Sequence, residues 1–253
     1  MKPTKMLAAA FGLFAGLAIC AQAMAAQTNI AVAANFTDAV KEIAAAFKAK
    51  TGHDAVLSFG ATGALYTQIT QDAPFEILLS ADTERPKKLV DDGLGVADSR
   101  FTYAIGKLVL WSKTPDLVKG EETLKSGGFT KLSIANPALA PYGAAAIETL
   151  KALKLDEAVQ PKIVQGNSIA QTYQFIDTGN AELGFVAMSQ LAGKSEGSRW
   201  VVPQTLYQPI RQDAVLLKKG ASNEAATAFM TFIKGAGARA IIEKFGYAID
   251  SQS

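Results

Sequence analysis

Four turns of the chain combine small residues with hydrogen-bond donors just before a helix-like segment. They are residues 34–37 (Ala-Asn-Phe-Thr), 60–63 (Gly-Ala-Thr-Gly), 136–143, and 166–169 (Gly-Asn-Ser-Ile). The first N–H groups of a helix have no partner within the helix and carry partial positive charge. Several helix starts that converge on one point would bind an anion without any cationic side chain. Each turn taken alone is better explained by ordinary helix capping, and only the four together favour an anion site.

The donors in these turns are neutral. Asn35, Thr62 and Ser168 could each add or orient a hydrogen bond, whereas no lysine or arginine lies in the four turns. A hydrogen bond to a charged group contributes roughly 1.5–3 kcal/mol, so roughly six of them would support micromolar binding. A site that offers donors alone favours an anion without a proton. This disfavours phosphate and leaves sulfate-like or molybdate-like dianions.

The sequence lacks the motifs of the common enzyme classes. It has no Gly-x-Ser-x-Gly, no His-Glu-x-x-His and no Walker-type phosphate loop. Its single histidine, His53, lies in a polar turn and has no neighbours for a metal site. Glu76 and Asp82 resemble a carboxylate pair, but Asp82 precedes a helix-like segment and is expected to cap it. We therefore predict a binding protein without a cofactor, not an enzyme.

The first 26 residues have the order of a secretory signal peptide. A short basic start precedes an uncharged apolar run over residues 6–19, and Ala23 and Ala25 supply the small residues that a signal peptidase needs. The run is shorter than the ~20 residues that span a bilayer. We expect cleavage near Ala25 or Ala26 and export of the chain to the periplasm.

Removal of this segment changes the charge of the protein. The whole chain has 25 basic and 23 acidic residues. Two lysines and no acids lie in the first 26 residues, so 23 of each remain. A formally neutral chain argues against nucleic acid or an anionic membrane surface as a partner. The only cysteine, Cys20, is also removed, so the exported protein would contain no disulfide.

Strand-like and helix-like segments alternate along the rest of the chain, which indicates an α/β fold with parallel strands flanked by helices. The predicted strands are residues 29–33, 54–59, 76–80, 107–112, 131–135, 162–165, 182–187 and 214–217. The predicted helices are residues 37–50, 62–71, 83–91, 141–153, 168–177, 222–234 and 236–245.

This pattern divides into two α/β units. The chain is expected to cross between them near residues 104–106 and again near 208–211. We predict one lobe from residues 27–105 with 209–253 and a second from residues 106–208. Small ligands bind between domains and at the carboxyl ends of parallel strands, so the ligand cleft should lie between the lobes.

Several stretches resemble the periplasmic molybdate-binding proteins of ABC transporters, and together they cover nearly all of the exported chain. The matching stretches are 30–37 (IAVAANFT), 58–63 (SFGATG), 73–82 (APFEILLSAD), Pro137 with 141–143 (PYG), 183–186 (LGFV) and 245–247 (FGY). The resemblance implies the two-lobed type II periplasmic binding fold, with a mainly parallel sheet flanked by helices in each lobe. Such a fold closes on its ligand like a hinged clamp.

The resemblance also implies which residues contact the anion. They are Asn35, Thr62 through its hydroxyl and N–H, and the backbone N–H groups of Tyr142 and Ile169. These groups would touch the oxygens of the oxyanion and would not ligate its metal directly. Some relatives have an anion-contacting tyrosine where this chain has Ala187, and Tyr142 or the longer Asn35 side chain could compensate.

The function implied by the resemblance is capture of molybdate, and also of tungstate, in the periplasm. The protein would deliver this ligand to the membrane permease of an ABC transporter, and we expect it to be a monomer. Two alternatives stay open. One is a carrier for another oxyanion such as sulfate, and the other is an exported enzyme on a similar two-lobed fold.

Overall fold

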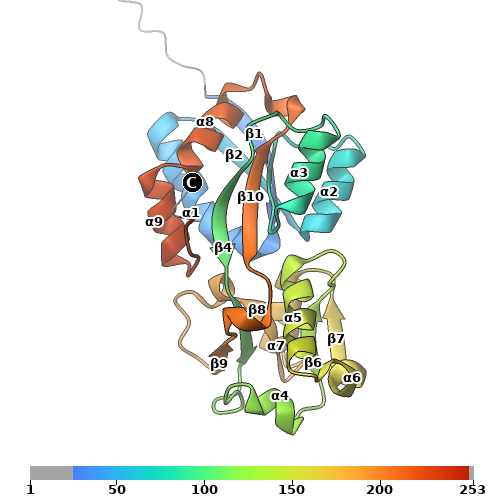
Figure 1. Ribbon diagram of the computed structural model, residues 1–253. Helices are drawn as coiled ribbons and strands as arrows, with labels where there is room; N and C mark the ends of the chain where they lie inside the picture. The colour runs from blue at the N-terminus through green and yellow to red at the C-terminus, as the bar shows by residue number, and fades with distance from the viewer. Residues whose placement is uncertain (1–24, 251–253) are drawn as a thin grey trace, which may run out of the picture.

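The computed structural model describes residues 25–250, which form two α/β lobes, one above the other in Figure 1. Each lobe contains a five-stranded sheet flanked by helices. The predicted two-lobed α/β fold is confirmed. Residues 1–24 of the predicted signal peptide lie outside the described residues. Within residues 25–250, no helix is long and apolar enough to cross a membrane.

The first sheet has the strand order β2-β1-β3-β10-β4. β1 pairs in parallel with β2 and β3, whereas β10 is antiparallel to β3 and β4. The sheet is therefore mixed, because the chain returns from the second lobe through β10. Its strands are β1 (Gln27–Ala33), β2 (Asp54–Gly60), β3 (Ile77–Leu79), β4 (Phe101–Gly106) and β10 (Ile210–Leu216).

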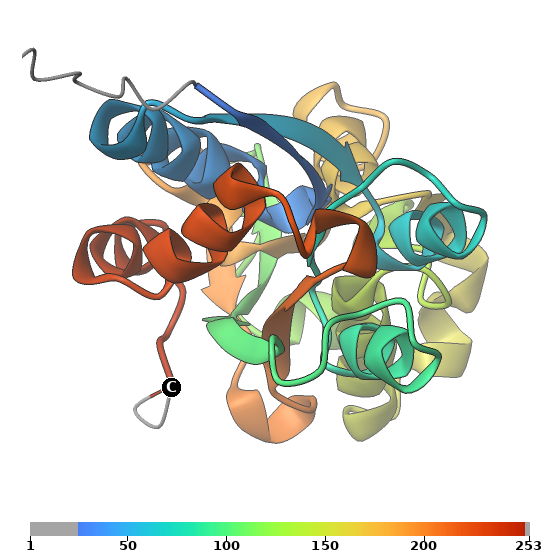
Figure 2. The same ribbon diagram turned by 90° about the horizontal axis from the view of Figure 1, so that it is seen from above.

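Helices cover both faces of this sheet because both faces are apolar. Successive side chains of a strand point to opposite faces, and Ile30 and Val32 lie in one buried cluster while Ala31 lies in another. Figure 2 shows the two groups of helices on opposite sides of the sheet. One face packs on α1 (Thr37–Thr51), α8 (Glu224–Ile233) and α9 (Ala236–Lys244), the other on α2 (Thr62–Thr70) and α3 (Glu84–Asp91).

The second sheet repeats this plan with the order β7-β6-β8-β5-β9. β6 is parallel to β7 and β8, and β5 is antiparallel to β8 and β9. Its strands are β5 (Leu108–Ser112), β6 (Leu132–Ala135), β7 (Ile163–Gly166), β8 (Leu183–Ala187) and β9 (Ser198–Val201). Its helices are α4 (Glu122–Ser126), α5 (Pro141–Ala152), α6 (Asp156–Val159) and α7 (Ile169–Asp177).

Every strand and helix predicted from the sequence is present, with ends that shift by a few residues. The prediction missed the strands β4 and β9 and the short helices α4 and α6. β4 and β9 are edge strands of their sheets. An edge strand packs less completely than a central one, so its sequence retains polar residues such as Thr102 and Arg199, which weaken the apolar signal of a strand.

The chain passes between the lobes twice. It leaves the first sheet at Gly106 and enters the second at Leu108, and it returns between β9 and β10. The first sheet is built from residues 27–106 and 210–216, the second from residues 108–201. The lobe boundaries expected at 105/106 and 208/209 stay a prediction.

Candidate functional site

The four residues expected to contact an anion line one pocket in the cleft between the lobes. Asn35 and Thr62 come from the first lobe, and Tyr142 and Ile169 come from the second. The pocket is small, and none of its lining residues carries a charge. It therefore suits a small ligand held by neutral groups. The other lining residues are Ala33, Ala34, Gly60, Ala61, Ala81, Ala140 and Pro141.

Each of the four contact residues lies where a parallel strand ends and a helix begins. A short 3-10 helix, Ala34–Phe36, follows β1, and α2 begins at Thr62 directly after β2. In the second lobe, α5 follows β6 and α7 follows β7. The four turns identified in the sequence therefore meet at the carboxyl ends of β1, β2, β6 and β7. Their helix starts supply N–H groups that have no partner within their helices.

Thr62 is placed to donate from its hydroxyl group. Its Oγ accepts a hydrogen bond from the N–H of Ala81 at 3.0 Å, and the residue is buried. Because the oxygen is the acceptor in that bond, the hydroxyl proton remains for another acceptor, such as a ligand oxygen. Thr62 does not cap α2, since the N-cap residue is Ala61 and no side chain caps this helix. Ordinary capping therefore does not explain Thr62.

The side chain of Asn35 is engaged behind the pocket. Its Nδ2 donates to Oε1 of Gln212 and to the hydroxyl of Tyr247, each at 2.9 Å. These two bonds use both protons of the amide. A ligand contact at Asn35 would therefore come from the backbone N–H of the helix start. Both amide protons of Asn35 are thus directed at Gln212 and Tyr247 and not at the pocket.

The phenol of Tyr142 belongs to the same buried network. Its hydroxyl accepts a hydrogen bond from Nε2 of Gln212 at 3.0 Å. Burial raises the pKa of Tyr142 well above its usual range, so the phenol stays neutral. The backbone N–H of Tyr142, in the first turn of α5, has no partner within its helix and is available to an anion in the pocket.

The network extends to residues that the sequence did not single out. The hydroxyl of Tyr103 bonds to the Ser80 carbonyl at 3.0 Å and lies 3.2 Å from Oε1 of Gln212. From the second lobe, Ser189 donates through Oγ to the carbonyl of Asn35 at 2.8 Å. Only Tyr247, in the Phe-Gly-Tyr ending, carried a sequence signal. Tyr103, Ser189 and Gln212 carried none.

Two other residues considered from the sequence have structural roles. Ser168 caps α7, because its Oγ accepts from the N–H of Gln171 at 3.3 Å. Ala187 is fully buried at the end of β8, and its N–H donates to Oε1 of Gln190 at 3.0 Å. Neither Ser168 nor Ala187 lines the pocket.

The candidate metal and carboxylate residues are also accounted for. Nδ1 of His53 accepts a hydrogen bond from the N–H of Ala26 at 3.2 Å. Glu76 accepts from the N–H of Asn29 at 3.0 Å, whereas Asp82 pairs with Arg85, so the two carboxylates have separate partners. Among residues 25–250, no group of three or more His, Cys, Asp or Glu side chains could hold a metal ion.

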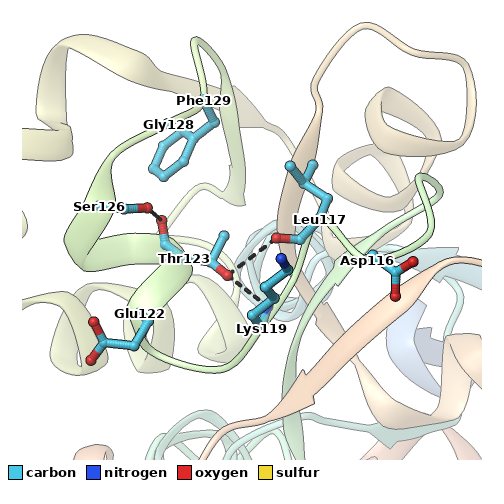
Figure 3. Close-up of a pocket in the computed structure, with 8 residues that line it drawn as sticks. All are labelled: Asp116, Leu117, Lys119, Glu122, Thr123, Ser126, Gly128 and Phe129. Carbon is cyan, nitrogen blue, oxygen red and sulfur yellow. Dashed lines mark hydrogen bonds between the residues drawn. The ribbon is translucent and has the colours of Figure 1, made fainter.

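A second hollow lies beside α4, at the end of the second lobe far from the cleft (Figure 3). The hydroxyl of Thr123 accepts from the N–H of Lys119 at 2.7 Å and lies 3.3 Å from the carbonyl of Leu117. Its polar groups therefore bond to one another, and its walls mix acidic with basic side chains. The lining residues are Asp116, Leu117, Lys119, Glu122, Thr123, Ser126, Gly128 and Phe129.

Two lobes that enclose an uncharged pocket define the class of the protein. The bacterial extracellular solute-binding protein family matches residues 28–248, and the chain belongs to this family. It is similar to the molybdate-binding protein ModA of Rhodobacter capsulatus, with 52% identity over 243 residues and 96% of each chain covered. ModA of Azotobacter vinelandii is 54% identical over 241 residues, which cover 94% of this chain and 95% of that protein.

The solved structures lead to the same relatives. The periplasmic molybdate-binding protein of Azotobacter vinelandii superposes with a TM-score of 0.86 at 40% identity. The match covers 88% of this chain and 100% of that one. The resemblance to periplasmic molybdate-binding proteins is thus confirmed over nearly the whole chain, and these relatives are binding proteins.

Proposed function

We propose that this protein captures molybdate in the periplasm and delivers it to the membrane permease of an ABC transporter. The observation that carries the proposal is the meeting of four helix starts, two from each lobe, around an uncharged pocket. The molybdate-binding relatives, at 52% and 54% identity, support the choice of ligand. Tungstate is a tetrahedral dianion of nearly equal size, so we propose that it binds as well.

The proposed contacts are hydrogen bonds to the oxygens of the anion. The N–H groups of Asn35, Tyr142 and Ile169 and both the N–H and the hydroxyl of Thr62 would donate them. This donor set favours a fully deprotonated oxyanion, because a protonated one would need an acceptor for its proton. No cofactor takes part in the proposed function. The metal of the oxyanion is cargo that never contacts a protein atom directly.

We further propose that the protein is an exported monomer that acts without nucleic acid. Signal cleavage near Ala25 or Ala26 would leave a new amino terminus at the start of the first lobe. The described contacts support an ordered chain from this point, since the N–H of Ala26 bonds to His53 and its carbonyl accepts from the N–H of Asp54 at 2.9 Å.

Thermal unfolding of the purified protein with molybdate, tungstate, sulfate and phosphate tests the proposal. A ligand at 100-fold excess over its dissociation constant stabilises the folded state by about 2.7 kcal/mol. We expect molybdate and tungstate to raise the melting temperature, and calorimetry to give one site per chain. A shift with sulfate or an organic acid but none with molybdate or tungstate would disprove the proposed ligand.

A further inference from the structure

A separate set of contacts joins the two lobes at the edge of the pocket. Nη2 of Arg85, on α3, donates to the carbonyl of Ala138 at 2.8 Å. The N–H of Gly63, in the first turn of α2, donates to the carbonyl of Leu139 at 2.9 Å. Two donors of the first lobe thus hold two neighbouring carbonyls of the second lobe. These contacts can exist only while the cleft is closed.

The two carbonyls belong to a stiff turn that leads directly into the pocket. The carbonyl of Asn136 accepts from the N–H groups of Leu139 and Ala140, and its Oδ1 accepts from the N–H of Ala138 at 3.0 Å. Ala140 is the first pocket-lining residue of this segment, and Tyr142 follows at the start of α5. Holding the turn therefore holds the helix start that faces the anion.

Asp82 fixes the guanidinium of Arg85 in this position. The two side chains form an ion pair, and Oδ1 of Asp82 also accepts from the N–H of Arg85 at 3.0 Å and from Oγ of Ser80 at 3.1 Å. An arginine held in this way loses less side-chain entropy when it reaches across the cleft. The carboxylate also balances the charge of the arginine, so this pair adds no net charge beside the pocket.

The contact between the lobes is tight at Gly63. A Cβ built on Gly63 would lie 3.0 Å from Cα of Leu139 and 3.1 Å from Nη2 of Arg85. The helix start, the turn and the guanidinium therefore meet at van der Waals distance. A side chain at this position would require Leu139 or Arg85 to shift by a few tenths of an ångström.

We propose that Arg85 is a positioning residue that fastens the closed cleft and sets the rate at which the ligand leaves. It acts through the 136–140 turn and does not touch the ligand itself. The proposal rests on the proposed oxyanion function, since it concerns release of that ligand. We call the contact between Arg85 and the carbonyl of Ala138 the latch. Its loss should raise the dissociation rate of the ligand. The association rate should stay nearly unchanged, because an open cleft admits the anion equally well.

Stopped-flow measurement of molybdate binding to Arg85→Gln tests this. We expect release roughly 10-fold faster than from the wild type, from the loss of one charge-assisted hydrogen bond. Arg85→Lys keeps a donor on a long stem and should restore part of the slow release. Arg199→Gln is the matched control, because Nη2 of Arg199 donates to the carbonyl of Lys194 within the second lobe.

Arg199→Gln should release molybdate at the wild-type rate. Release from Arg85→Gln within twofold of the wild type would overturn the latch. An Arg85→Gln variant with slower association and unchanged release would also overturn it, since the residue would then act on entry. If the wild type bound no molybdate, the proposed ligand would fail, and a ligand-free experiment would then test the latch.

Hydrogen exchange of the ligand-free protein provides that experiment. The N–H of Gly63 lies in the first turn of α2 and has no partner within its helix, so its bond to Leu139 is its protection. We expect this N–H to exchange faster in Arg85→Gln than in the wild type or in Arg199→Gln. Equal exchange rates in the three proteins would overturn the latch whatever the ligand.

Discussion

The side-chain amide of Gln212 joins Tyr142 of the second lobe to Asn35 of the first. Its Nε2 donates to the hydroxyl of Tyr142 at 3.0 Å, and its Oε1 accepts from Nδ2 of Asn35 at 2.9 Å. Only a side chain with both a donor and an acceptor can serve both partners. Asn35 and Tyr142 line the pocket from opposite lobes, so this one amide supports both walls of the site from behind.

Gln212→Glu should make oxyanion binding depend on pH. At neutral pH the new carboxylate would place a buried negative charge behind an anion site, and we expect affinity to fall at least about 10-fold. Burial raises the pKa of a carboxyl group, so affinity should recover as the pH falls and the carboxyl takes up a proton. Calorimetry between about pH 5 and about pH 8 would measure this.

Gln204→Glu is the matched control for this prediction. Gln204 is exposed, and its Nε2 donates to the carbonyl of Tyr207 within the second lobe. It adds the same charge away from the network of Gln212, so binding should follow the wild type across the pH range. A Gln212→Glu variant with wild-type affinity at neutral pH would show that the amide is unconnected with the site.

Thr62→Val should weaken molybdate binding by roughly 1–3 kcal/mol, because a hydroxyl donor is lost against a buried charge. Valine has nearly the same shape as threonine, so the pocket should keep its size. Thr62→Ser retains the hydroxyl and should bind nearly as well as the wild type. Titration calorimetry of the three proteins measures the difference. Equal affinity for Thr62→Val and the wild type would reduce Thr62 to a partner of Ala81.

Gly106→Ala should destabilise the closed form. A Cβ at Gly106 would lie only 2.1 Å from the hydroxyl of Tyr142 and 2.7 Å from Nε2 of Gln212. Opening the lobes would relieve the overlap with Tyr142, so the cost falls on ligand binding. Overpacking of this kind costs roughly 1–3 kcal/mol, and we expect a matching loss of affinity in calorimetry.

Gly237→Ala provides the comparison for Gly106→Ala. A Cβ at Gly237, in α9, meets no atom within 4 Å. Alanine is the better helix former by roughly 1 kcal/mol, so this variant should be as stable as the wild type or more so and should bind normally. Similar affinity losses in both variants would point to a general effect of added methyl groups.

The protein should lose stability steeply in alkaline solution. Burial raises the pKa values of Tyr103, Tyr142 and Tyr247 in the folded state. Above the unfolded tyrosine pKa of about 10, the unfolded chain releases protons that the folded protein retains. The unfolded state then binds fewer protons, so the free energy of unfolding falls as pH rises, by about 1.4 kcal/mol per pH unit for each tyrosine.

Denaturant unfolding on either side of the unfolded tyrosine pKa, about 10, checks this slope. The stabilisation from these buried phenols is complete below that pH and is lost as the pH rises toward the folded pKa values. Tyr103→Phe removes one titrating group, so its stability should fall less steeply in alkali than that of the wild type. Parallel curves for the two proteins would rule out Tyr103 as a contributor.

The sequence predicted the walls of the site because they depend on local signals. Small residues and hydrogen-bonding side chains before Thr62, Tyr142 and Ile169 marked helix starts, and the α/β pattern implied parallel strands with their carboxyl ends together. The helix-start signals and the parallel order of the strands together place the turns at one edge of each sheet. The identity of the ligand came from resemblance, because helix starts alone do not distinguish one dianion from another.

The support behind the walls could not be predicted. Gln212 and Asn35 are 177 residues apart in the chain, and Tyr247 and Asn35 are 212 apart. No local pattern links residues at such distances in a single sequence. Arg85 carried no sequence signal for a related reason, since it lies outside the four turns and meets Ala138 only in the folded protein. The structure shows that an arginine beside the pocket is compatible with a neutral site, because Asp82 balances it.

The position of β10 has a consequence for the order in which the two lobes fold. β10 lies between β3 and β4, so the first lobe lacks a strand of its sheet until residues 210–216 arrive. The second sheet is complete by residue 201. Domains that emerge from a channel usually fold in chain order, but here the second lobe should fold first. Until then the edges of the early strands stay unpaired and prone to aggregation, and a chaperone would be of most use in this interval.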